Sequence, residues 1–354
     1  MSDRDRARPL RVINSRAPIR ICDNGGWTDT WFARHGRVFN IGVHPCADVQ
    51  IEVSRIDGRE DRIVIHAENF GERYTVRSGA PGWGRHPLLE AAIERMGVPE
   101  ETAIDVTIFS EAPSGASTGT SAAVTVALIG ALDRLTPGHL SPQEAAATAQ
   151  SVEVDMLGQQ CGIQDQLCSA FGGINYIEMS GYPRAEVIPI LPADSIWWEL
   201  ERRLVLVYLG KSHSSSAVHE KVIEELEKAG PDCAALDKLR STAGPARDAV
   251  LAGDFEALGR SMVRNTDAQG RLHPDLVGRD ARKVIEIARA HGAPGWKVNG
   301  AGGEGGSVTI LCGPLSAVKR AMIREIEQEN PLYRNILIRL SRGGLCTWER
   351  GALS

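Results

Sequence analysis

The stretch from Glu111 to Val124 constrains the fold most, because it joins two apolar segments through a run of small and hydroxyl-bearing residues. The β-branched residues from Thr102 to Phe109 predict a strand, and the apolar pattern from Ala122 to Leu135 predicts a helix. A loop that leaves a strand and enters a helix presents unpaired first-turn N–H groups and the positive end of the helix dipole. We therefore expect an anion site here, and we interpret it as a cradle for the phosphates of a nucleoside triphosphate.

The residues inside this loop suit such a cradle. Gly115 and Gly119 let the backbone approach a phosphate closely. Hydroxyl groups add further donors, from Ser114, Ser117, Thr118, Thr120 and Ser121. The alternative is an ordinary Gly/Ser turn in which Thr120 or Ser121 caps the helix.

A second alternative for the same residues is a hydrolase. Residues 115–119 read Gly-Ala-Ser-Thr-Gly and match the G-x-S-x-G pattern of a nucleophile elbow, with Ser117 as the nucleophile. Two observations favour the phosphate cradle. Residues 111–114 separate the predicted strand from the first glycine, so the sharp elbow turn is not formed, and a lone nucleophile does not need so many hydroxyl neighbours.

Length and composition predict two domains of the α+β class. A chain of 354 residues that is 42% hydrophobic can bury a large core and exceeds the usual size of one domain. Prolines 189 and 192 suggest a boundary near residue 195, which gives domains of residues 1–195 and 196–354. Strand patterns dominate the first half, and strands alternate with helices in the second, so we expect mixed sheets.

Two predicted strands near the ends of the chain complete this outline. Residues Val12 to Cys22 predict a strand that Ala17-Pro18 interrupts, and Asn335 to Leu340 predict one strand that closes the chain.

Charge and cysteine usage predict a cytoplasmic protein without a nucleic-acid partner. The net charge is -5 with mixed signs and no basic run, which argues against nucleic acid as a partner. Residues 1–11 are charged and lack an apolar run, so we expect no signal peptide. Apolar runs fall far short of the ~20 residues of a membrane span. The seven cysteines form no CxxC pair and are typical of reduced, buried thiols. We expect a monomer or a homodimer.

Two carboxylates follow the loop on consecutive helices. Ser141-Pro142-Gln143-Glu144 is a capping box, and the helix that it opens is predicted to run to about Leu157 and to carry Glu153. Asp165 begins a short helix from Ile163 to Ala170. The ordinary interpretation is a solvated face for Glu153 and a helix cap for Asp165. The alternative is phosphoryl transfer, which needs an oxygen ligand for Mg²⁺ and a group that takes the proton of the acceptor hydroxyl.

Separated segments of the chain carry a family resemblance. Arg16-Ala-Pro-Ile-Arg20 with Gly25-Gly26-Trp27-Thr28-Asp29 forms the first, residues 113–123 the second, and Lys297-Val-Asn-Gly-Ala-Gly-Gly-Glu-Gly-Gly306 the third. They resemble, in order and spacing, the three motifs of the GHMP kinases, the superfamily of galactokinase, homoserine kinase and mevalonate kinase. Residues 162–166 with 171–175 are similar to the segment that bears the catalytic aspartate of that family. The first motif is nearest to fucokinases and heptose-phosphate kinases.

The resemblance implies a fold, cofactors and a set of site residues. The implied fold is a ribosomal-S5-like N-terminal domain and a ferredoxin-like C-terminal domain, with ATP between them. Asp165 would be the general base, with Arg20 beside it and near the γ-phosphate. Mg²⁺ would be held by Ser121 and Glu153. The implied ATP-binding residues are Pro113, Gly115, Ser117, Thr118, Gly119, Thr120, Ser121, Ala122, Gly302 and Gly303. The implied substrate-binding residues are Asp29, Gly26, Trp27, Gly172 and Gly173.

Departures from the family pattern bear on the substrate. Trp27 and Gly26 stand where galactokinase has a sugar-binding histidine and a glutamate, which argues against galactose. Ser117-Thr118 replaces the usual Gly-Leu, and Glu304 replaces a glycine. We expect an ATP-dependent kinase that phosphorylates the anomeric hydroxyl of a heptose- or fucose-like sugar or sugar phosphate. Its rivals are the Ser117 hydrolase and a non-catalytic sugar sensor that keeps the fold.

Overall fold

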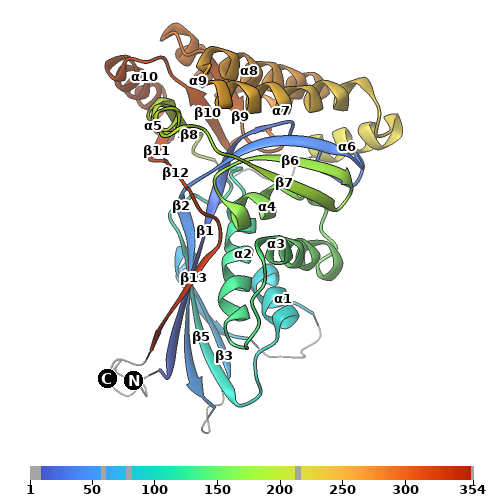
Figure 1. Cartoon of the computed structure of the whole chain (residues 1–354), viewed down its shortest axis with the longest axis vertical. Coiled ribbons are helices and arrows are strands. Elements are labelled where there is room, and N and C mark those ends of the chain that lie inside the picture. Colours follow the sequence, from blue (N-terminus) through green and yellow to red (C-terminus); the bar gives the residue numbers. More distant parts are fainter. Residues whose placement is uncertain (1–8, 57–60, 77–81, 212–216, 352–354) are drawn as a thin grey trace.

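The computed structural model describes residues 9–56, 61–76, 82–211 and 217–351. Residues 1–8, where we expect no signal peptide, lie outside the described part of the chain. Figure 1 shows two lobes along the long axis, one built on a long sheet and one made of helices around a smaller sheet. The predicted α+β class with mixed sheets is confirmed.

The larger sheet has nine strands within the described residues. Its main path is β13-β1-β2-β5-β3-β4, while β12 and β6 pair with β2, and β7 pairs with β6. The strands are β1 (Arg11–Asn24), β2 (Gly36–Arg55), β3 (Ile63–Ala67), β4 (Glu72–Thr75), β5 (Thr102–Ser110), β6 (Ile174–Gly181), β7 (Arg184–Ile190), β12 (Arg339–Leu340) and β13 (Cys346–Gly351). The β3–β5 pair is parallel, and the other pairs between these strands are antiparallel.

Strand β1 corrects one prediction. It runs without a break through Ala17-Pro18, where we expected an interruption. The register against β2 shifts between Pro18 and Ile19, which marks a bulge. A bulge tolerates proline, because it does not require the missing N–H of a regular ladder.

Four helices pack on one face of this sheet (Figure 1). They are α1 (Pro87–Met96), α2 (Thr120–Asp133), α3 (Pro142–Ser151) and α4 (Gln164–Phe171). Helix α2 is buried along most of its length, as its continuous run of Ala, Val, Leu and Ile requires. The capping box at Ser141 and Glu144 is confirmed. The helix predicted to reach Leu157 instead passes at Val152–Met156 into a π-helical turn, which carries Glu153.

The smaller sheet is antiparallel, in the order β11-β8-β10-β9. Its lobe contains α5 (Asp194–Arg203), β8 (Leu204–Tyr208), α6 (Ala217–Ala229), α7 (Ala234–Ala252), α8 (Phe255–Leu272), α9 (Arg279–Ala290), β9 (Gly295–Val298), β10 (Ser307–Leu311), α10 (Ser316–Glu329) and β11 (Arg334–Ile336). Strands and helices thus follow the β-α-β-β-α-β succession of ferredoxin-like folds. The ribosomal-S5-like character of the other lobe stays a prediction.

The last strands return to the first sheet. We predicted one strand over residues 335–340, but the structure has β11 in the smaller sheet and β12 on β2 of the larger one. Strand β13 then pairs with β1 from Arg11↔Gly351 to Arg16↔Cys346. The division at residue 195 stays a prediction, and residues 339–351 complete the sheet of the first lobe.

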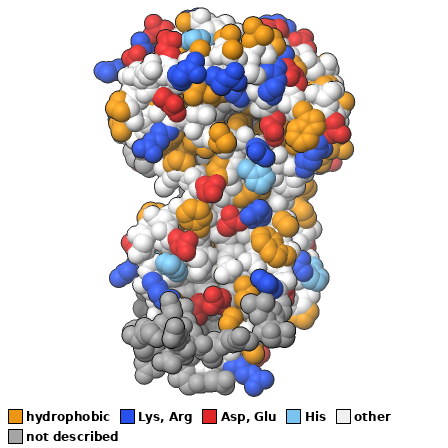
Figure 2. Space-filling view, turned by 90° about the vertical axis from the view of Figure 1, so that its left-hand side faces the viewer, with side chains coloured by type: hydrophobic (Ala, Val, Ile, Leu, Met, Phe, Trp, Pro, Cys, Tyr) orange, Lys and Arg blue, Asp and Glu red, His pale blue; other side chains and the backbone are white. Residues whose placement is uncertain are grey.

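The molecule narrows between the two lobes. Figure 2 shows a waist there, with acidic, basic and hydrophobic side chains interspersed on the face that it presents. Within the described ranges, no helix has the length and apolar character needed to cross a membrane.

Candidate active site

The loop between β5 and α2 leads into a helix end that no side chain caps. Gly119 is the N-cap residue of α2, with φ of 70° and no capping side chain. A Cβ at Gly119 would lie 3.1 Å from Asp165 Cγ, so this left-handed position also leaves no room for a larger residue. The alternative in which Thr120 or Ser121 caps the helix is wrong. The first-turn N–H groups of α2 are therefore free to bind an anion.

Three carbonyl groups anchor this loop to the rest of the protein. Ser307 Oγ donates to the Ala116 carbonyl at 2.6 Å. Arg20 donates from Nη1 to the Ser117 carbonyl and from its backbone N–H to the Thr118 carbonyl, the latter at 2.9 Å. In a trans peptide the C=O and the following N–H point in opposite directions. The N–H groups of residues 117–119 therefore point away from these partners, and together they can bind an anion.

Arg20 also holds Asp165. Its Nε lies 2.7 Å from Oδ1 and its Nη2 lies 3.1 Å from Oδ2, a two-bond arrangement that fixes the carboxylate plane. Burial by itself lowers the pKa of Arg20, but the charges of Asp165 and Asp23 outweigh it and raise this pKa above its ordinary value. The Arg20 side chain is 5% exposed and that of Asp165 is 28% exposed, so the aspartate is the member of the pair that a ligand can reach.

A cavity of about 820 Å³ lies beside these groups. Its lining includes Arg20, Asp165 and, from the predicted ATP-binding set, Pro113, Gly115, Ser117, Thr118, Gly119, Thr120 and Ser121. Ala122 lies outside the lining, one position further into α2. The lining also includes Asn69, Phe70, Arg85 and His86, which the sequence analysis missed because no motif marks them. The rings of Phe70 and His86 are 5.1 Å apart.

In the glycine-rich segment of residues 297–306, the residues that line the cavity differ from the two that were predicted to bind ATP. Gly300 and Ala301 line it, whereas Gly302 and Gly303 lie outside the lining. A Cβ at Gly302 would lie 2.2 Å from the Leu276 carbonyl oxygen, and the Gly303 N–H donates to that same oxygen at 2.9 Å. The structure thus gives Gly302 and Gly303 a packing role and favours Gly300 and Ala301 as the residues next to a ligand.

The two predicted metal ligands differ in exposure. Ser121 is exposed in the first turn of α2 and lines the cavity. Glu153 is 8% exposed, and its Oε1 accepts from Gln166 Nε2 at 2.7 Å. Burial, with a further contribution from the charge of Asp165, raises the pKa of Glu153 to about 7. Among the described residues no three His, Cys, Asp or Glu side chains gather as a metal site. One carboxylate, one hydroxyl and the phosphates of a nucleotide form a set of oxygen ligands that suits Mg²⁺. Glu153, however, lies outside the lining of the cavity, so its role as a metal ligand together with Ser121 stays a prediction.

Asp29 serves as a helix cap in this structure. Its Oδ2 accepts from the N–H groups of Ile163 at 3.0 Å and Gln164 at 3.1 Å, the residues that begin α4. The residue is 3% exposed and lies outside the cavity lining. Burial raises the pKa of Asp29 to about 6, although the hydrogen bond from Gln164 acts in the opposite direction. Its predicted contact with substrate stays a prediction, whereas its contact with the helix that carries Asp165 is present.

The other predicted substrate residues also have packing partners. A Cβ at Gly26 would lie 2.7 Å from Asp23 Oδ2. Trp27 belongs to a buried apolar cluster and its ring stacks on that of His219, 6.0 Å between centroids. Gly172 and Gly173 pack against the returning C-terminal segment, where the Gly173 N–H donates to the Ser341 carbonyl at 2.8 Å. The structure does not bring these four residues into the cavity described above.

Comparisons with known proteins agree with this fold. Residues 87–173 match the family described as GHMP kinases N terminal domain. A mevalonate kinase from Pyrococcus abyssi is 30% identical over 296 residues, which cover 81% of this chain and 78% of that protein. A D-glycero-alpha-D-manno-heptose 7-phosphate kinase from Campylobacter jejuni is 24% identical over 96% of this chain and 100% of its own.

A bifunctional fucokinase/GDP-fucose pyrophosphorylase from Arabidopsis thaliana is 25% identical over 88% of this chain, but the chain spans only 31% of that protein. Likewise, this chain spans 64% of a mevalonate kinase from Methanothermobacter thermautotrophicus. Among solved structures, a D-glycero-D-manno-heptose 1-phosphate kinase from Bacteroides thetaiotaomicron has a TM-score of 0.73 at 22% identity, over 95% of this chain and 98% of that one. By fold, the chain is an α+β protein of the type that these kinases share. It belongs to the GHMP kinase family.

Proposed function

We propose that this protein is an ATP- and Mg²⁺-dependent kinase that phosphorylates the anomeric hydroxyl of a sugar or a sugar phosphate. One observation carries the proposal: the uncapped end of α2, the anchored loop of residues 116–118 and the Arg20–Asp165 pair all meet at one cavity. Phosphoryl transfer is catalysed chiefly by positioning and by stabilising charge, and these groups supply both.

Each part of the site has a role in this proposal. The N–H groups of residues 117–119 and of the first turn of α2 bind the triphosphate. Arg20 offsets the charge that develops on the transferred group and orients Asp165 through two hydrogen bonds. Asp165 takes the proton of the attacking hydroxyl. The part of the cavity that Phe70 and His86 line takes the base of the nucleotide, because aromatic rings stack on bases.

Mg²⁺ belongs to the same proposal. When bound, the ion would offset the negative charge of the phosphates. Ser121 and Glu153 would hold it from the protein side. Glu153 has to bind as a carboxylate, and its partner Gln166 fixes one of its oxygens.

The class of acceptor is supported by two relatives and opposed by another. The relatives from Campylobacter jejuni and Arabidopsis thaliana are named for a heptose phosphate and for fucose. The relative from Pyrococcus abyssi is named for mevalonate, an acceptor that is not a sugar. The Gly25-Gly26-Trp27-Thr28-Asp29 segment, which resembles the first two kinds, favours the sugar. A cytoplasmic location and a monomer or homodimer stay predictions.

The hydrolase alternative is disfavoured by the position of its nucleophile. Ser117 Oγ is buried and has no hydrogen-bond partner within the described residues. A Cβ at Gly306 would lie 2.7 Å from it, so the hydroxyl packs against that glycine. A nucleophilic serine needs a base beside it and a path to the substrate. The sensor alternative is tested by turnover.

The test is ATP consumption by the purified protein with L-fucose, heptoses, heptose phosphates, galactose and mevalonate, followed by ³¹P NMR of the product. We expect ADP formation with a heptose- or fucose-like acceptor and an anomeric phosphate as product. Turnover with mevalonate alone would contradict the acceptor class. ATP binding without turnover on any acceptor would favour the sensor, and ester hydrolysis that is lost in Ser117→Ala would favour the hydrolase.

A further inference from the structure

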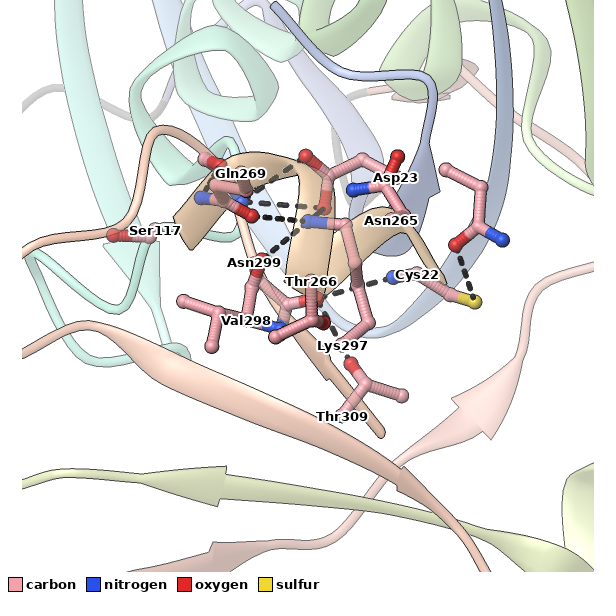
Figure 3. A network of polar contacts seen from close by, with 12 residues as sticks. Cys22, Asp23, Ser117, Asn265, Thr266, Gln269, Lys297, Val298, Asn299 and Thr309 are labelled. Atoms are coloured by element: carbon pink, nitrogen blue, oxygen red, sulfur yellow. Dashed lines mark hydrogen bonds and ion pairs between the residues drawn. The ribbon is translucent and has the colours of Figure 1, made fainter. Parts of the chain in front are cut away.

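A buried ion pair lies behind the wall of the cavity. Lys297, on β9, is 1% exposed, and Asp23, at the end of β1, is 0% exposed. Lys297 Nζ lies 3.3 Å from Asp23 Oδ1 (Figure 3). Neither residue lines the cavity, so neither can touch a ligand there. Burying two charges costs solvation free energy, and an apolar pair of similar size could fill the same space at less cost.

The partners of this pair converge on one glycine. Lys297 Nζ also donates to Gln269 Oε1 at 3.2 Å and to the Val298 carbonyl. Gln269, on α8, donates from Nε2 to the Gly300 carbonyl at 3.0 Å. The Gly300 N–H in turn lies 3.2 and 3.1 Å from the two carboxylate oxygens of Asp23. Both backbone groups of Gly300 are thus held by partners of Lys297. Figure 3 shows the contacts of Lys297 with Asp23 and Gln269.

Gly300 is the point at which this network reaches the reacting groups. Its φ is 64°, and a Cβ there would lie 3.1 Å from the Ser117 carbonyl oxygen and 3.4 Å from Arg20 Nη2. Ser117 and Arg20 are themselves joined by a hydrogen bond, and Arg20 holds Asp165. Gly300 therefore lies close to the Ser117 carbonyl and to the guanidinium of Arg20. A displacement of Gly300 toward them would disturb the loop of residues 116–118 and the guanidinium that orients Asp165.

A neighbouring set of hydrogen bonds anchors the loop of residues 116–118 through Ala116. Asn299 Oδ1 accepts from the Cys22 N–H at 3.1 Å, and Asn299 Nδ2 donates to Ser307 Oγ at 3.0 Å. Ser307 then donates to the Ala116 carbonyl. Buried hydrogen bonds therefore connect strand β1, the segment of residues 297–307 and the loop of residues 116–118.

We propose that Lys297 and Asp23 are positioning residues for phosphoryl transfer, which hold Gly300 against Ser117 and Arg20 and so fix the wall on which the triphosphate lies. This inference rests on the proposed kinase function and adds two residues to its site. They act through Gly300, Gln269 and Arg20, and they have no contact with substrate or nucleotide.

The test compares Lys297 with a second lysine whose ammonium group also donates to a backbone carbonyl group. Lys297→Met removes the ammonium group and keeps most of the stem. Lys319→Met on α10 is the matched control, because Lys319 is half-buried and its Nζ donates to the Arg202 and Leu204 carbonyls at 2.7 and 2.8 Å, away from the cavity. At a temperature where both variants are folded, we expect Lys297→Met to lower kcat by roughly 10- to 100-fold, since small misplacements in an active site have effects of this size. The acceptor KM should change less than kcat, and Lys319→Met should keep the wild-type kcat.

A double variant separates positioning from stability. Asp23→Asn combined with Lys297→Met removes both charges, so it should unfold at a higher temperature than Lys297→Met, which leaves Asp23 buried and unpaired. We expect kcat of the double variant to stay well below that of the wild type. If Lys297→Met does not fold, the double variant decides by the same criterion.

Two outcomes would overturn the inference: a wild-type kcat in Lys297→Met, or recovery of both unfolding temperature and kcat in the double variant. Failure of the kinase proposal is a different result, because the wild type and Lys319→Met would then also lack turnover.

Discussion

Arg20 is the single residue that connects most of the candidate site. Its guanidinium bonds to the Ser117 carbonyl and to both oxygens of Asp165, residues that lie 97 and 145 positions away in the sequence. Periodicity and local motifs cannot predict such a pair, because no pattern relates two positions so far apart. The family resemblance could, since it implied that Arg20 lies beside Asp165. The two residues do lie in contact, and their roles in catalysis stay proposals.

A first prediction concerns the hydroxyl of Ser117. Ser117→Ala removes an oxygen that is buried and without a partner in the described structure, so we expect unchanged or slightly higher stability. Kinase activity should stay within about tenfold of the wild type, because a neutral hydrogen bond is worth ~1 kcal/mol. Steady-state kinetics and thermal unfolding measure both. Loss of all turnover in a folded Ser117→Ala protein would contradict this prediction and would indicate that the hydroxyl takes part in the reaction.

A second prediction concerns Glu153 as a metal ligand. Glu153→Gln exchanges a carboxylate for a neutral oxygen, so a higher Mg²⁺ concentration should be needed for half-maximal activity. The control is Asp155→Asn in the same π-helical turn, because Asp155 is exposed whereas Glu153 is buried. A Mg²⁺ titration of each variant measures the effect. Equal titrations for both variants would remove Glu153 from the metal site.

At the scale of single elements, local residue patterns predicted where α2 and α3 begin. They could not predict features that depend on a partner far away in the sequence. The apolar run that predicts α2 begins two residues after the observed start at Thr120, and the Ser141 capping box marks α3 correctly. By contrast, the cap of α4 could not be predicted, because its acceptor is Asp29, 134 positions before Ile163. The bulge that carries β1 through Pro18 likewise depends on the partner strand.

The third prediction is argued from α4. Asp29→Ala leaves the first N–H groups of this helix without an acceptor, so the free energy of unfolding should fall by about 1–2 kcal/mol. Because α4 carries Asp165, kcat should fall as well. Asp254→Ala is the control, since Asp254 caps α8 through the Ala257 N–H at 2.8 Å and lies far from Asp165 in the chain. That variant should lose stability and keep kcat. A raised acceptor KM with unchanged kcat in Asp29→Ala would instead indicate direct contact with the acceptor.

The raised pKa of Asp29 adds a pH dependence to this prediction. Its pKa is raised from 3.8 to about 6 in the folded protein, so the folded state binds more protons between these pH values than the unfolded state. The contribution of Asp29 to the stability of the wild type should therefore decline with rising pH in this window. Asp29→Asn stays neutral and lacks that contribution. The stability difference between wild type and variant, measured by denaturant unfolding, should shift in favour of the variant from pH 3.8 to 6 and then stay level; a constant difference would contradict it.

At the scale of the whole molecule, the site exists because distant segments meet between the lobes. The loop before α2, the end of β1 and the segment after β9 come from both halves of the chain. Sequence patterns predicted the class of fold and marked each of these segments. They could not predict that β12 and β13 return to the first sheet, or that Lys297 pairs with Asp23. Each of these pairings joins residues far apart in the sequence, which only the folded structure brings together.

The most direct test of this account is the kcat of Asp165→Asn with the best acceptor found, measured together with its affinity for ATP. We expect kcat to fall by about 10²–10⁴-fold, because the proposed proton acceptor is lost, while ATP should still bind at the site proposed for it, the loop of residues 116–118 and the end of α2. A folded Asp165→Asn protein that transfers phosphate at close to the wild-type rate would contradict the central claim that the Arg20–Asp165 pair performs the reaction.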